Sequence, residues 1–337
     1  MKIAIISAIV ASALMATTPL MKDAKNAGLL PIPAKLQELN KLIDNPKNPI
    51  TYAKVELGKK LFFDTRLSKS GLISCNTCHN LATGGVDGLQ AAVGHKWSQN
   101  PHHLNSPTVY NAVFFSSQFW DGRSPNVENQ AQGPIQAAPE MAATPEHIVS
   151  VVTSMPAYVA EFKKAYGDKP ITFELVADTI ATFERTLVTP APYDKFLAGN
   201  DKALTPVQKK GLKTFIDLGC TSCHTGIALG GEMQPFGVVA PYKYAHIGDF
   251  AGNKDKMVKV PTLRNITETA PYFHNGAVAT LKEAIQEMGR IQLGATVTDE
   301  QASDIQEFFK SLEGKKPTVV YPQLPACSAT TPKPDIN

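Results

Sequence analysis

The sequence has little cysteine, little net charge and few long apolar runs, and each shortage excludes a class of protein. Only five cysteines occur in 337 residues, and with Cys327 standing alone there is no disulfide framework. The formal net charge is +3, with no block of lysine or arginine, so we expect no nucleic-acid partner and no attachment to a membrane surface. Beyond the N-terminus no run is apolar enough to span a bilayer, so the mature form is expected to lack a membrane span.

What is present is the composition of an ordinary globular protein. Hydrophobic residues make up 43% and charged residues 19% of the chain, which are average values. The length exceeds that of one typical domain, so we predict two. The 25 prolines predict long, irregular connections between the helices.

The N-terminus carries the features of a secretory signal peptide. Lys2 precedes a short apolar run, and small residues follow it, which is the layout of an exported precursor. We predict that residues 1–16 are the signal peptide, with cleavage after Ala13 or Ala16. A buried helix or an uncleaved anchor is the alternative. In a Gram-negative cell, export would place the mature protein in the periplasm.

Four of the five cysteines form two copies of the pattern Cys-x-x-Cys-His. The two copies are Cys75, Cys78 and His79, and Cys220, Cys223 and His224. This pattern is typical of c-type haem attachment, in which the thiols bond the haem vinyl groups and the histidine binds iron. A redox dithiol or half of a zinc site is the alternative, but ribbon-type zinc sites bring their second pair within about 20 residues. We therefore predict two covalently bound haems c, with His79 and His224 as proximal iron ligands.

A weak internal repeat surrounds the two motifs. The matching segments are 55–64 with 209–217, which lead to the motifs, and 177–187 with 302–312, which follow them. Gly58 matches Gly211, and apolar residues recur at the same helical positions in the closing segments. Chance similarity between amphipathic helices is the alternative, but the shared order of three elements favours duplication.

The repeat predicts a mainly α fold with two cytochrome c-like domains. Each domain would surround one covalently bound c-type haem and carry long irregular loops. We place the N-terminal domain at 22–190 and the C-terminal domain at 191–314, because prolines and a glycine interrupt the helical pattern near the boundary. The tail, 315–337, either packs on the first domain or is partly disordered.

The second iron has methionine candidates for its sixth ligand. Met233, Met257 and Met288 all follow the second motif, and a thioether ligand raises the reduction potential, which suits electron transfer. Met288 is favoured because it precedes the closing helical segment, where a cytochrome c-like domain carries its methionine. A methionine in the core is the more common case.

The first iron has no single obvious sixth ligand. Met141 and Met155 are possible, but His95 is closer in sequence to the first motif, and His102 and His103 compete with it. A histidine in a loop is more often a solvated side chain than an iron ligand.

Several further motifs resemble those of bacterial di-haem cytochrome c peroxidases. They are Asn-Ser-Pro-Thr-Val-Tyr-Asn-Ala at 105–112, Phe-Trp-Asp-Gly-Arg at 119–123, Val-Pro-Thr-Leu-Arg-Asn at 260–265 and Ala-Pro-Tyr-Phe-His-Asn-Gly at 270–276. They occur in the family's order, and the resemblance covers residues 53–312. It implies a periplasmic enzyme that reduces hydrogen peroxide to water. Its electrons would come from a small cytochrome c or cupredoxin.

The resemblance assigns unlike roles to the two haems. The haem on His79 is similar to the peroxidatic centre of the family. The haem on His224, with Met288 as its other ligand, is similar to the centre where electrons enter. His95 matches the histidine that, in many members, binds the peroxidatic iron at rest and leaves when the other haem is reduced.

Three further side chains match catalytic residues of the family. Trp120 matches the tryptophan between the haems, and Gln130 and Glu140 match the pair that faces peroxide. A carboxylate in a dry pocket can take a proton from one peroxide oxygen and deliver it to the other, while Gln130 can hold peroxide without titrating. The alternatives are a core residue for Trp120 and a helix N-terminus at Pro139-Glu140, where acids are common.

Calcium is also implied by the resemblance. Asn105 would supply a side-chain oxygen, and Thr269 and Pro271 would supply backbone oxygens, which are the hard ligands that Ca²⁺ prefers. The sequence has no independent calcium motif, and Asn105 could be a simple turn residue. The family often forms homodimers, but no interface can be identified from the sequence.

Two other functions remain open at this point. One is a MauG-like di-haem oxidase acting on a partner protein, but that group carries tyrosine where Met288 stands. The other is a di-haem electron carrier without catalysis, in which both irons would keep six ligands in every redox state.

Overall fold

The computed structural model describes residues 17–336, so the predicted signal peptide, 1–16, lies outside the described residues. The α-helices are α1 (Pro19–Asn26), α2 (Leu36–Ile43), α3 (Tyr52–Phe63), α4 (Cys75–Cys78), α5 (Val127–Gln136), α6 (Pro145–Thr153), α7 (Pro156–Tyr166), α8 (Phe173–Glu184), α9 (Pro192–Leu197), α10 (Pro206–Asp217), α11 (Leu281–Met288) and α12 (Asp299–Lys310). One antiparallel pair is formed by β1 (Met233–Pro235) and β2 (Met257–Lys259). The predicted mainly α class is confirmed.

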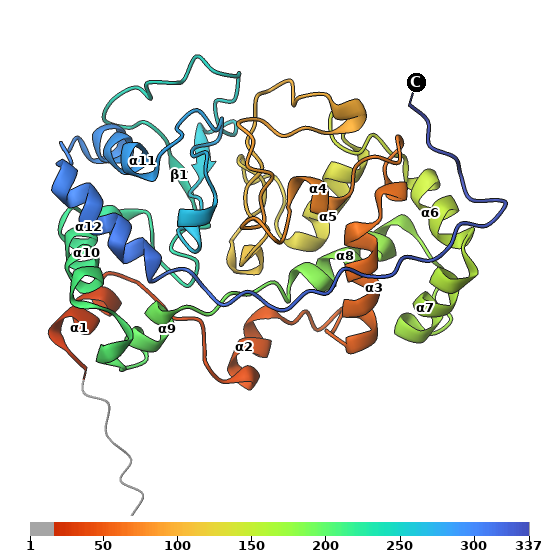
Figure 1. Ribbon diagram of the computed structural model, residues 1–337, viewed down its shortest axis with the longest axis horizontal. Helices are drawn as coiled ribbons and strands as arrows, with labels where there is room; N and C mark the ends of the chain where they lie inside the picture. Colours follow the sequence, from red (N-terminus) through yellow and green to blue (C-terminus); the bar gives the residue numbers. More distant parts are fainter. Residues whose placement is uncertain (1–16, 337) are drawn as a thin grey trace, which may run out of the picture.

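The helices form two groups (Figure 1). One group contains α2 to α8, and the other contains α1 and α9 to α12 with the strand pair. Long irregular segments connect the elements in both groups, as the prolines predicted. Each group has its own hydrophobic core, so the chain buries apolar surface around two centres.

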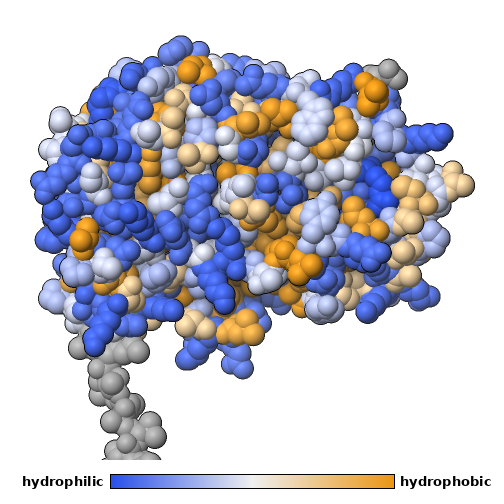
Figure 2. All heavy atoms as spheres, in the orientation of Figure 1, coloured by the Kyte–Doolittle hydropathy of each residue, from blue (hydrophilic) through white to orange (hydrophobic). Residues whose placement is uncertain are grey.

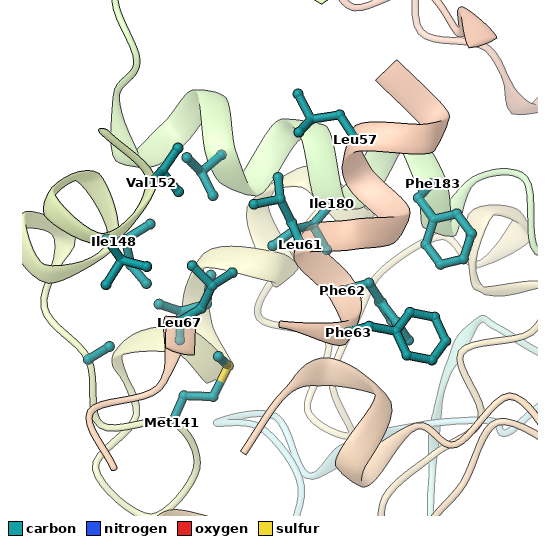
Figure 3. Close-up of a cluster of buried hydrophobic side chains, with 14 of the residues drawn as sticks. Leu57, Leu61, Phe62, Phe63, Leu67, Met141, Ile148, Val152, Ile180 and Phe183 are labelled. Atoms are coloured by element: carbon teal, nitrogen blue, oxygen red, sulfur yellow. The ribbon is translucent and has the colours of Figure 1, made fainter. Parts of the chain in front are cut away.

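The first core lies between α3, α6, α7 and α8 (Figure 3). Its buried side chains include Leu57, Leu61, Phe62, Ile148, Val152, Ile180 and Phe183. The α3 helix begins where the Thr51 hydroxyl accepts a hydrogen bond from the backbone N of Lys54, which satisfies one of the free N–H groups of the first turn. Each fully buried leucine or phenylalanine contributes about 1.5–3 kcal/mol.

The second core contains α10, α11 and α12 together with the segment around α1, which the sequence analysis assigned to the first domain. Met21, Ala24 and Leu29, in and just after α1, are buried with Phe196 of α9 and Phe215 of α10. This differs from the expected N-terminal division at 22–190, because the apolar face of α1 fits against the C-terminal helices rather than those that follow it. The region of the predicted boundary contains a short helix, α9, whose Tyr193, Asp194, Phe196 and Leu197 are buried.

The repeated glycines lie where two helices cross in each core. A Cβ atom on Gly58 of α3 would lie 2.1 Å from the backbone O of Thr179 in α8. A Cβ on Gly211 of α10 would lie 1.9 Å from the backbone O of Asp304 in α12. Only glycine permits such an approach without a shift of the backbone, so the matched glycines set the same close helix packing before each haem motif.

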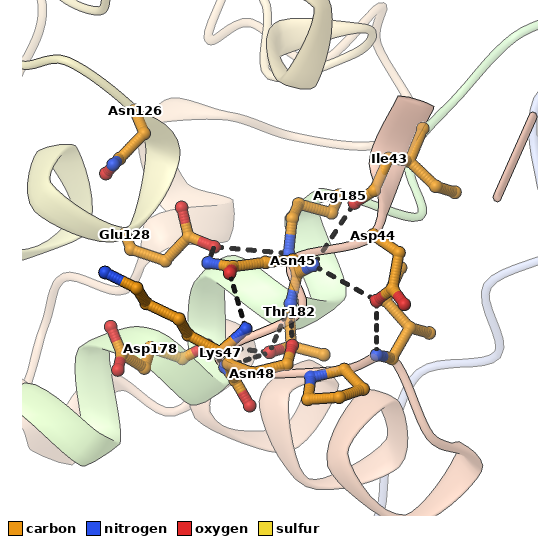
Figure 4. Close-up of polar contacts among 12 residues, drawn as sticks. Ile43, Asp44, Asn45, Lys47, Asn48, Asn126, Glu128, Asp178, Thr182 and Arg185 are labelled. Atoms are coloured by element: carbon orange, nitrogen blue, oxygen red, sulfur yellow. Dashed lines mark hydrogen bonds and ion pairs between the residues drawn. The ribbon is translucent and has the colours of Figure 1, made fainter. Parts of the chain in front are cut away.

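A polar network attaches the segment after α2 to α5 and α8 (Figure 4). Arg185 is buried and donates to the backbone O of Ile43 (3.2 Å) and of Asn48 (2.7 Å). Its guanidinium also lies 3.4 Å from Glu128 and 3.6 Å from Asp44. Because a buried cation needs partners, this arginine fixes the irregular segment between α2 and α3.

The C-terminal tail runs from α12 across to the first group of helices (Figure 1). Arg66 donates to the backbone O of Pro325 (2.7 Å) and to the sulfur of Cys327 (3.3 Å). The ring of Tyr321 packs edge-on against Phe63, with centroids 4.8 Å apart. The tail therefore packs on the first group of helices.

Within residues 17–336, no helix combines the length and the apolar composition needed to cross a membrane. In the space-filling view, hydrophilic residues cover most of the visible face, and apolar residues gather in small patches (Figure 2).

We expect Gly58→Ala to destabilise the protein, because the new methyl group would press on the backbone of α8. Overpacking of this kind costs about 1–3 kcal/mol, measured as a fall in the free energy of unfolding by denaturant titration. The control is Lys164→Ala, an exposed position in α7, expected to change stability by less than about 0.5 kcal/mol. Equal stability of the two variants would contradict the proposed helix contact.

Candidate functional site

The two Cys-x-x-Cys-His motifs line two cavities. The first cavity, of about 690 Å³, is lined by Cys78 and His79, and the second, of about 190 Å³, by Cys220, Cys223 and His224. Part of the wall is shared, because several residues border both cavities. Cys75 is partly buried against the first core and is not among the residues that line the first cavity.

The ring of His224 is oriented by its own loop. Nδ1 lies 3.0 Å from the backbone O of Leu229, and because a carbonyl only accepts, Nδ1 carries the proton. Burial lowers the pKa of His224, so the ring is neutral. The other nitrogen, Nε2, is then free with its lone pair, which is the form that binds a metal.

A buried ion pair fixes the loop that follows the second motif. Arg264 is fully buried, and its guanidinium lies 2.7 Å from Oδ1 and 3.1 Å from Oδ2 of Asp194. The same guanidinium donates to the backbone O of Ile227, and the hydroxyl of Thr262 donates to the backbone O of Ala228. The motif at 260–265 thus positions the residues just before Leu229, the partner of His224.

His79 is placed at the end of the short helix α4. The N-cap residue Ser74 donates its backbone N–H to the Thr77 hydroxyl at 2.9 Å, which begins the turn that carries both cysteines. Nδ1 of His79 is buried and has no hydrogen-bond partner among the described residues. Burial lowers the pKa of His79, and Asp87 opposes that effect, so this imidazole is also neutral.

The thiols have the wrong electrostatics for a redox dithiol. Burial raises the pKa of Cys78 to about 12 and that of Cys220 to about 11, and burial also raises the pKa of Cys75. Reactive dithiols have lowered pKa values instead. The thiols of Cys220 and Cys223 beside the neutral imidazole of His224 at the wall of the second cavity fit a covalently held haem, and at the first motif Cys78 and His79 line the cavity with Cys75 behind them in the same turn.

Of the three methionines that follow the second motif as candidate ligands, Met288 alone lines the second cavity. It is the last residue of α11 and lines the second cavity together with His224. A π-helical turn, Gly289–Leu293, follows it, and such turns occur often at functional sites. Met233 and Met257 lie in the strand pair instead and do not line this cavity.

Gln130 and Glu140 both line the first cavity with His79. Gln130 belongs to α5, whereas Glu140 lies in a turn between α5 and α6. The helix N-terminus considered for Pro139-Glu140 is absent there, because the next helix begins at Pro145. Burial raises the pKa of Glu140, and Arg123 opposes the shift.

His95 does not line the first cavity in this structure, although its neighbour Gly94 does. Lys96 and Trp97 both have left-handed backbone, with φ of 58° and 59°, a conformation that costs about 1–3 kcal/mol per residue outside glycine. His102 lines the cavity and its Nδ1 lies 3.0 Å from Asp249. The backbone of Gly94 packs closely on that of Glu140, since a Cβ on Gly94 would lie 2.7 Å from Cα of Glu140, so the loop of His95 lies beside the first cavity although His95 is not among its lining residues.

Trp120 lies in the wall shared by the two cavities. Its side chain is 8% exposed and borders both cavities. The indole Nε1 donates to the backbone O of Asn105 (3.0 Å), and the backbone O of Trp120 accepts from the backbone N of Lys259 (2.8 Å). Hydrogen bonds to segments before and after it hold the indole between the two motifs.

The three residues expected to bind calcium lie on one wall. Asn105, Thr269 and Pro271 all line the second cavity. The side-chain nitrogen of Asn105 donates to the backbone O of Leu89 at 2.6 Å, which orients its amide. Among residues 17–336, no cluster of three histidine, cysteine or acidic side chains could hold a metal ion, so a cation here would depend on amide and backbone oxygens.

Two buried ionisable residues of the cavity walls were not predicted from the sequence. Lys259 is 3% exposed and borders both cavities, and Glu184 is buried in the wall of the first. Burial lowers the pKa of Lys259 to about 7 and raises that of Glu184 to about 8. The only signal in the sequence was a lysine between two valines, Val258 and Val260, which is unusual in a buried strand.

Comparison with known proteins identifies the family. A sequence profile described as di-haem cytochrome c peroxidase matches residues 52–202. Cytochrome c551 peroxidase of Pseudomonas aeruginosa is 45% identical over 333 residues, covering 95% of this chain and 94% of that protein. Cytochrome c551 peroxidase of Nitrosomonas europaea is 47% identical over 286 residues, covering 82% of this chain and 85% of that protein.

A solved structure gives the same fold. A MauG-like protein associated with microbial copper homeostasis aligns with a TM-score of 0.70 and 25% identity, covering 81% of this chain and 93% of that chain. The long, nearly complete overlap with these relatives extends beyond the first motif to both halves of the chain.

We expect Asp194→Asn to lower the free energy of unfolding by about 3–5 kcal/mol, because it leaves Arg264 buried without its counter-ion. The matched control is Asp217→Asn, which breaks an exposed pair with Lys213 at 2.8 Å and is expected to cost less than about 1 kcal/mol. Both values come from denaturant titration of the haem-loaded protein. Equal losses would show that the buried pair does not support the second loop.

Proposed function

This chain belongs to the di-haem cytochrome c peroxidase family, whose enzymes are oxidoreductases acting on peroxide, and we propose that it reduces hydrogen peroxide to water. The reaction consumes H₂O₂, two electrons and two protons and yields two water molecules. The electrons would arrive singly from a small periplasmic cytochrome c or cupredoxin, enter at the C-terminal site and pass to the N-terminal site. The two haems c that the family implies would supply the iron that exchanges these electrons and binds peroxide.

The observation that carries the proposal is the difference between the two cavities. The second cavity contains a thioether, Met288, beside His224. The first contains an amide and a carboxyl group, Gln130 and Glu140, beside His79. A site with two strong ligands suits electron transfer, and a site with polar side chains and room for a substrate suits catalysis.

Glu140 and Gln130 have different roles in the reduction of peroxide. Glu140 takes the proton from one oxygen and returns a proton to the other, which leaves as water. Its carboxyl group is half-buried, and burial raises its pKa toward the working pH, which favours transfer in both directions. Gln130 offers both a donor and an acceptor, so it can orient peroxide without changing charge.

The segment around His95 is the proposed gate of the first site. In the resting oxidised enzyme His95 would occupy the ligand position opposite His79, and it would leave after the other centre is reduced. Support comes from the strained backbone at Lys96 and Trp97, because a segment held in a costly conformation can change to another.

Other parts of the proposal concern the surroundings of the two sites. Ca²⁺ would bind Oδ1 of Asn105 and the backbone oxygens of Thr269 and Pro271, and would link segments from both halves. The predicted signal peptide, 1–16, supports a periplasmic location, and a homodimer is the expected assembly. Residues 22–190 and 191–314 are the proposed peroxidatic and electron-transfer domains. The helix α1, at the start of the chain, packs on the electron-transfer domain.

Met288 favours a peroxidase over a MauG-like oxidase. A MauG-like enzyme would carry tyrosine at this position, and tyrosine binds iron through a phenolate oxygen rather than a thioether sulfur. The polar groups at the first cavity, in turn, argue against an electron carrier without catalysis, because such a carrier needs no proton donor near its iron.

The central experiment measures oxidation of reduced cytochrome c by the purified, haem-loaded protein. We expect turnover only when hydrogen peroxide is present, after one-electron reduction and with calcium in the buffer. The controls omit peroxide or the enzyme. Absence of peroxide-dependent turnover with both a cytochrome c and a cupredoxin donor, with and without prior reduction, would refute the proposed function.

Glu140→Gln should lower kcat/KM for peroxide by about 100- to 10,000-fold, the usual contribution of a general acid–base group. In the wild type, activity should fall as the pH drops through the raised pKa of Glu140, because the carboxylate that accepts the proton is then lost. This acidic limb should be missing in the variant. Glu146→Gln, at an exposed position in α6, is the control and should leave both rate and pH profile unchanged.

His95→Gly should be active without prior reduction, because no side chain would then close the first site at rest. The measurement is the initial rate with the fully oxidised enzyme, together with its EPR spectrum, which should gain a high-spin signal. His102→Gly tests the competing histidine of the same cavity. If only the His102 variant is active without reduction, the assignment of His95 is wrong.

A further inference from the structure

Lys259 occupies the wall between the two cavities. It is the last residue of β2, is 3% exposed and borders both cavities. Its backbone N–H donates to the backbone O of Trp120 at 2.8 Å, so the strand is fixed to the segment that carries the indole. The lysine is therefore held next to Trp120 in the wall shared by the two cavities.

The ammonium group of Lys259 has no counter-ion of its own. Within residues 17–336 it makes no hydrogen bond or ion pair, and Nζ lies 4.7 Å from the centroid of the Phe115 ring. The carboxylate that attracts it, Asp121, is already paired with Arg123 at 2.8 Å. The lysine is thus almost entirely buried in the cavity wall, and its ammonium group has no anion of its own.

Three other buried cations of this chain each have an anion or a hydrogen-bond acceptor beside them. The guanidinium of Arg264 lies against Asp194, and that of Arg185 against Glu128. The ammonium of Lys54 donates to Oδ1 of Asn48 (2.8 Å) and to the backbone O of Pro49 (3.0 Å). A buried charge without a partner costs several kcal/mol, so the exception at Lys259 indicates that an anion is supplied by a bound group.

Haem brings that anion, because each haem carries two propionate carboxylates. We propose that Lys259 is the counter-cation for a haem propionate at the wall between the sites, and that its charge raises the reduction potential of the haem held by His79. The inference rests on the proposed presence of a haem at each motif. Lys259 acts as a positioning residue, since it would hold a carboxylate of the cofactor and would not touch peroxide.

The geometry of β2 favours the first haem as the one affected. Val258 and Val260, the neighbours of Lys259, line the second cavity alone, and because successive side chains of a strand point to opposite faces, Lys259 lies on the side of the first cavity, which Asp121 also lines. A nearby positive charge also favours the reduced iron, which carries one positive charge fewer than the oxidised iron. Removal of the charge should therefore make the first haem harder to reduce and should affect the second haem less.

The experiment is a spectroelectrochemical titration of haem-loaded Lys259→Met, whose side chain has similar length and no charge. We expect the equilibrium constant for one-electron reduction of the first haem to fall at least tenfold, which corresponds to a downward shift of about 59 mV or more. The shift of the second haem should be smaller. A change of less than twofold at both haems would overturn the proposal.

The matched control is Lys54→Met. Lys54 is also a buried lysine, but it lies at the start of α3, has its own partners and borders neither cavity. This variant should lose stability and keep both potentials. If the two variants shift the first haem equally, the effect arises from general loosening of the fold and the proposal is wrong.

If Lys259→Met does not take up both haems, its potentials cannot be compared, and the haem content of a second variant is measured instead. Lys259→Arg keeps the charge, so it should bind two haems with potentials close to those of the wild type. Binding of two haems by the arginine variant alone supports a required cation. If the arginine variant also fails, the side chain serves packing and the proposal falls.

A count of covalent haems in the wild type separates this inference from the proposed function. Fewer than two haems would refute the premise shared by both. Two haems, normal peroxide turnover and unchanged potentials in Lys259→Met would refute the role of Lys259 alone.

Discussion

The rest of the structure depends on the wall between the two cavities, where segments from both halves of the chain are joined by backbone hydrogen bonds. Trp120 donates from its indole to Asn105 and accepts from the backbone of Lys259, while the backbone N of Asn105 donates to the backbone O of His274. These bonds join two segments of the first half, at residues 105 and 120, to two of the second half, at residues 259 and 274. The wall that separates the two cavities is therefore built from both halves.

The two halves have the same helix packing before their haem motifs, but different side chains line the two cavities. In each half, a glycine lets two helices cross closely just before the motif, at Gly58 and at Gly211. The rest diverges: the second site has Met288 on the wall beside its histidine, and the first has Glu140 and Gln130. Duplication thus explains the scaffold, whereas the unlike cavity walls explain why one centre would carry electrons and the other would use them.

The sequence predicted well those features that depend on short spacings. The helical segments at 55–64, 177–187, 209–217 and 302–312 follow from local patterns, and the structure has the helices α3, α8, α10 and α12 there. Contacts over long separations were missed. The helix α1 packs on the C-terminal half, where Met21 and Ala24 are buried with Phe196 and Phe215, and no local pattern encodes a contact between residues so far apart in the chain. The position of the His95 side chain likewise depends on the backbone of its loop, which is left-handed at Lys96 and Trp97.

The sequence alone determined that this protein carries two Cys-x-x-Cys-His sites, because haem attachment needs only five consecutive residues with the correct spacing. It also separated the two sites through Met288. Only the tertiary structure placed Lys259 and Glu184 in their cavity walls, where burial shifts their pKa values. Burial is a property of everything packed around a side chain, so the charge state of such a residue cannot be inferred from its neighbours in the chain.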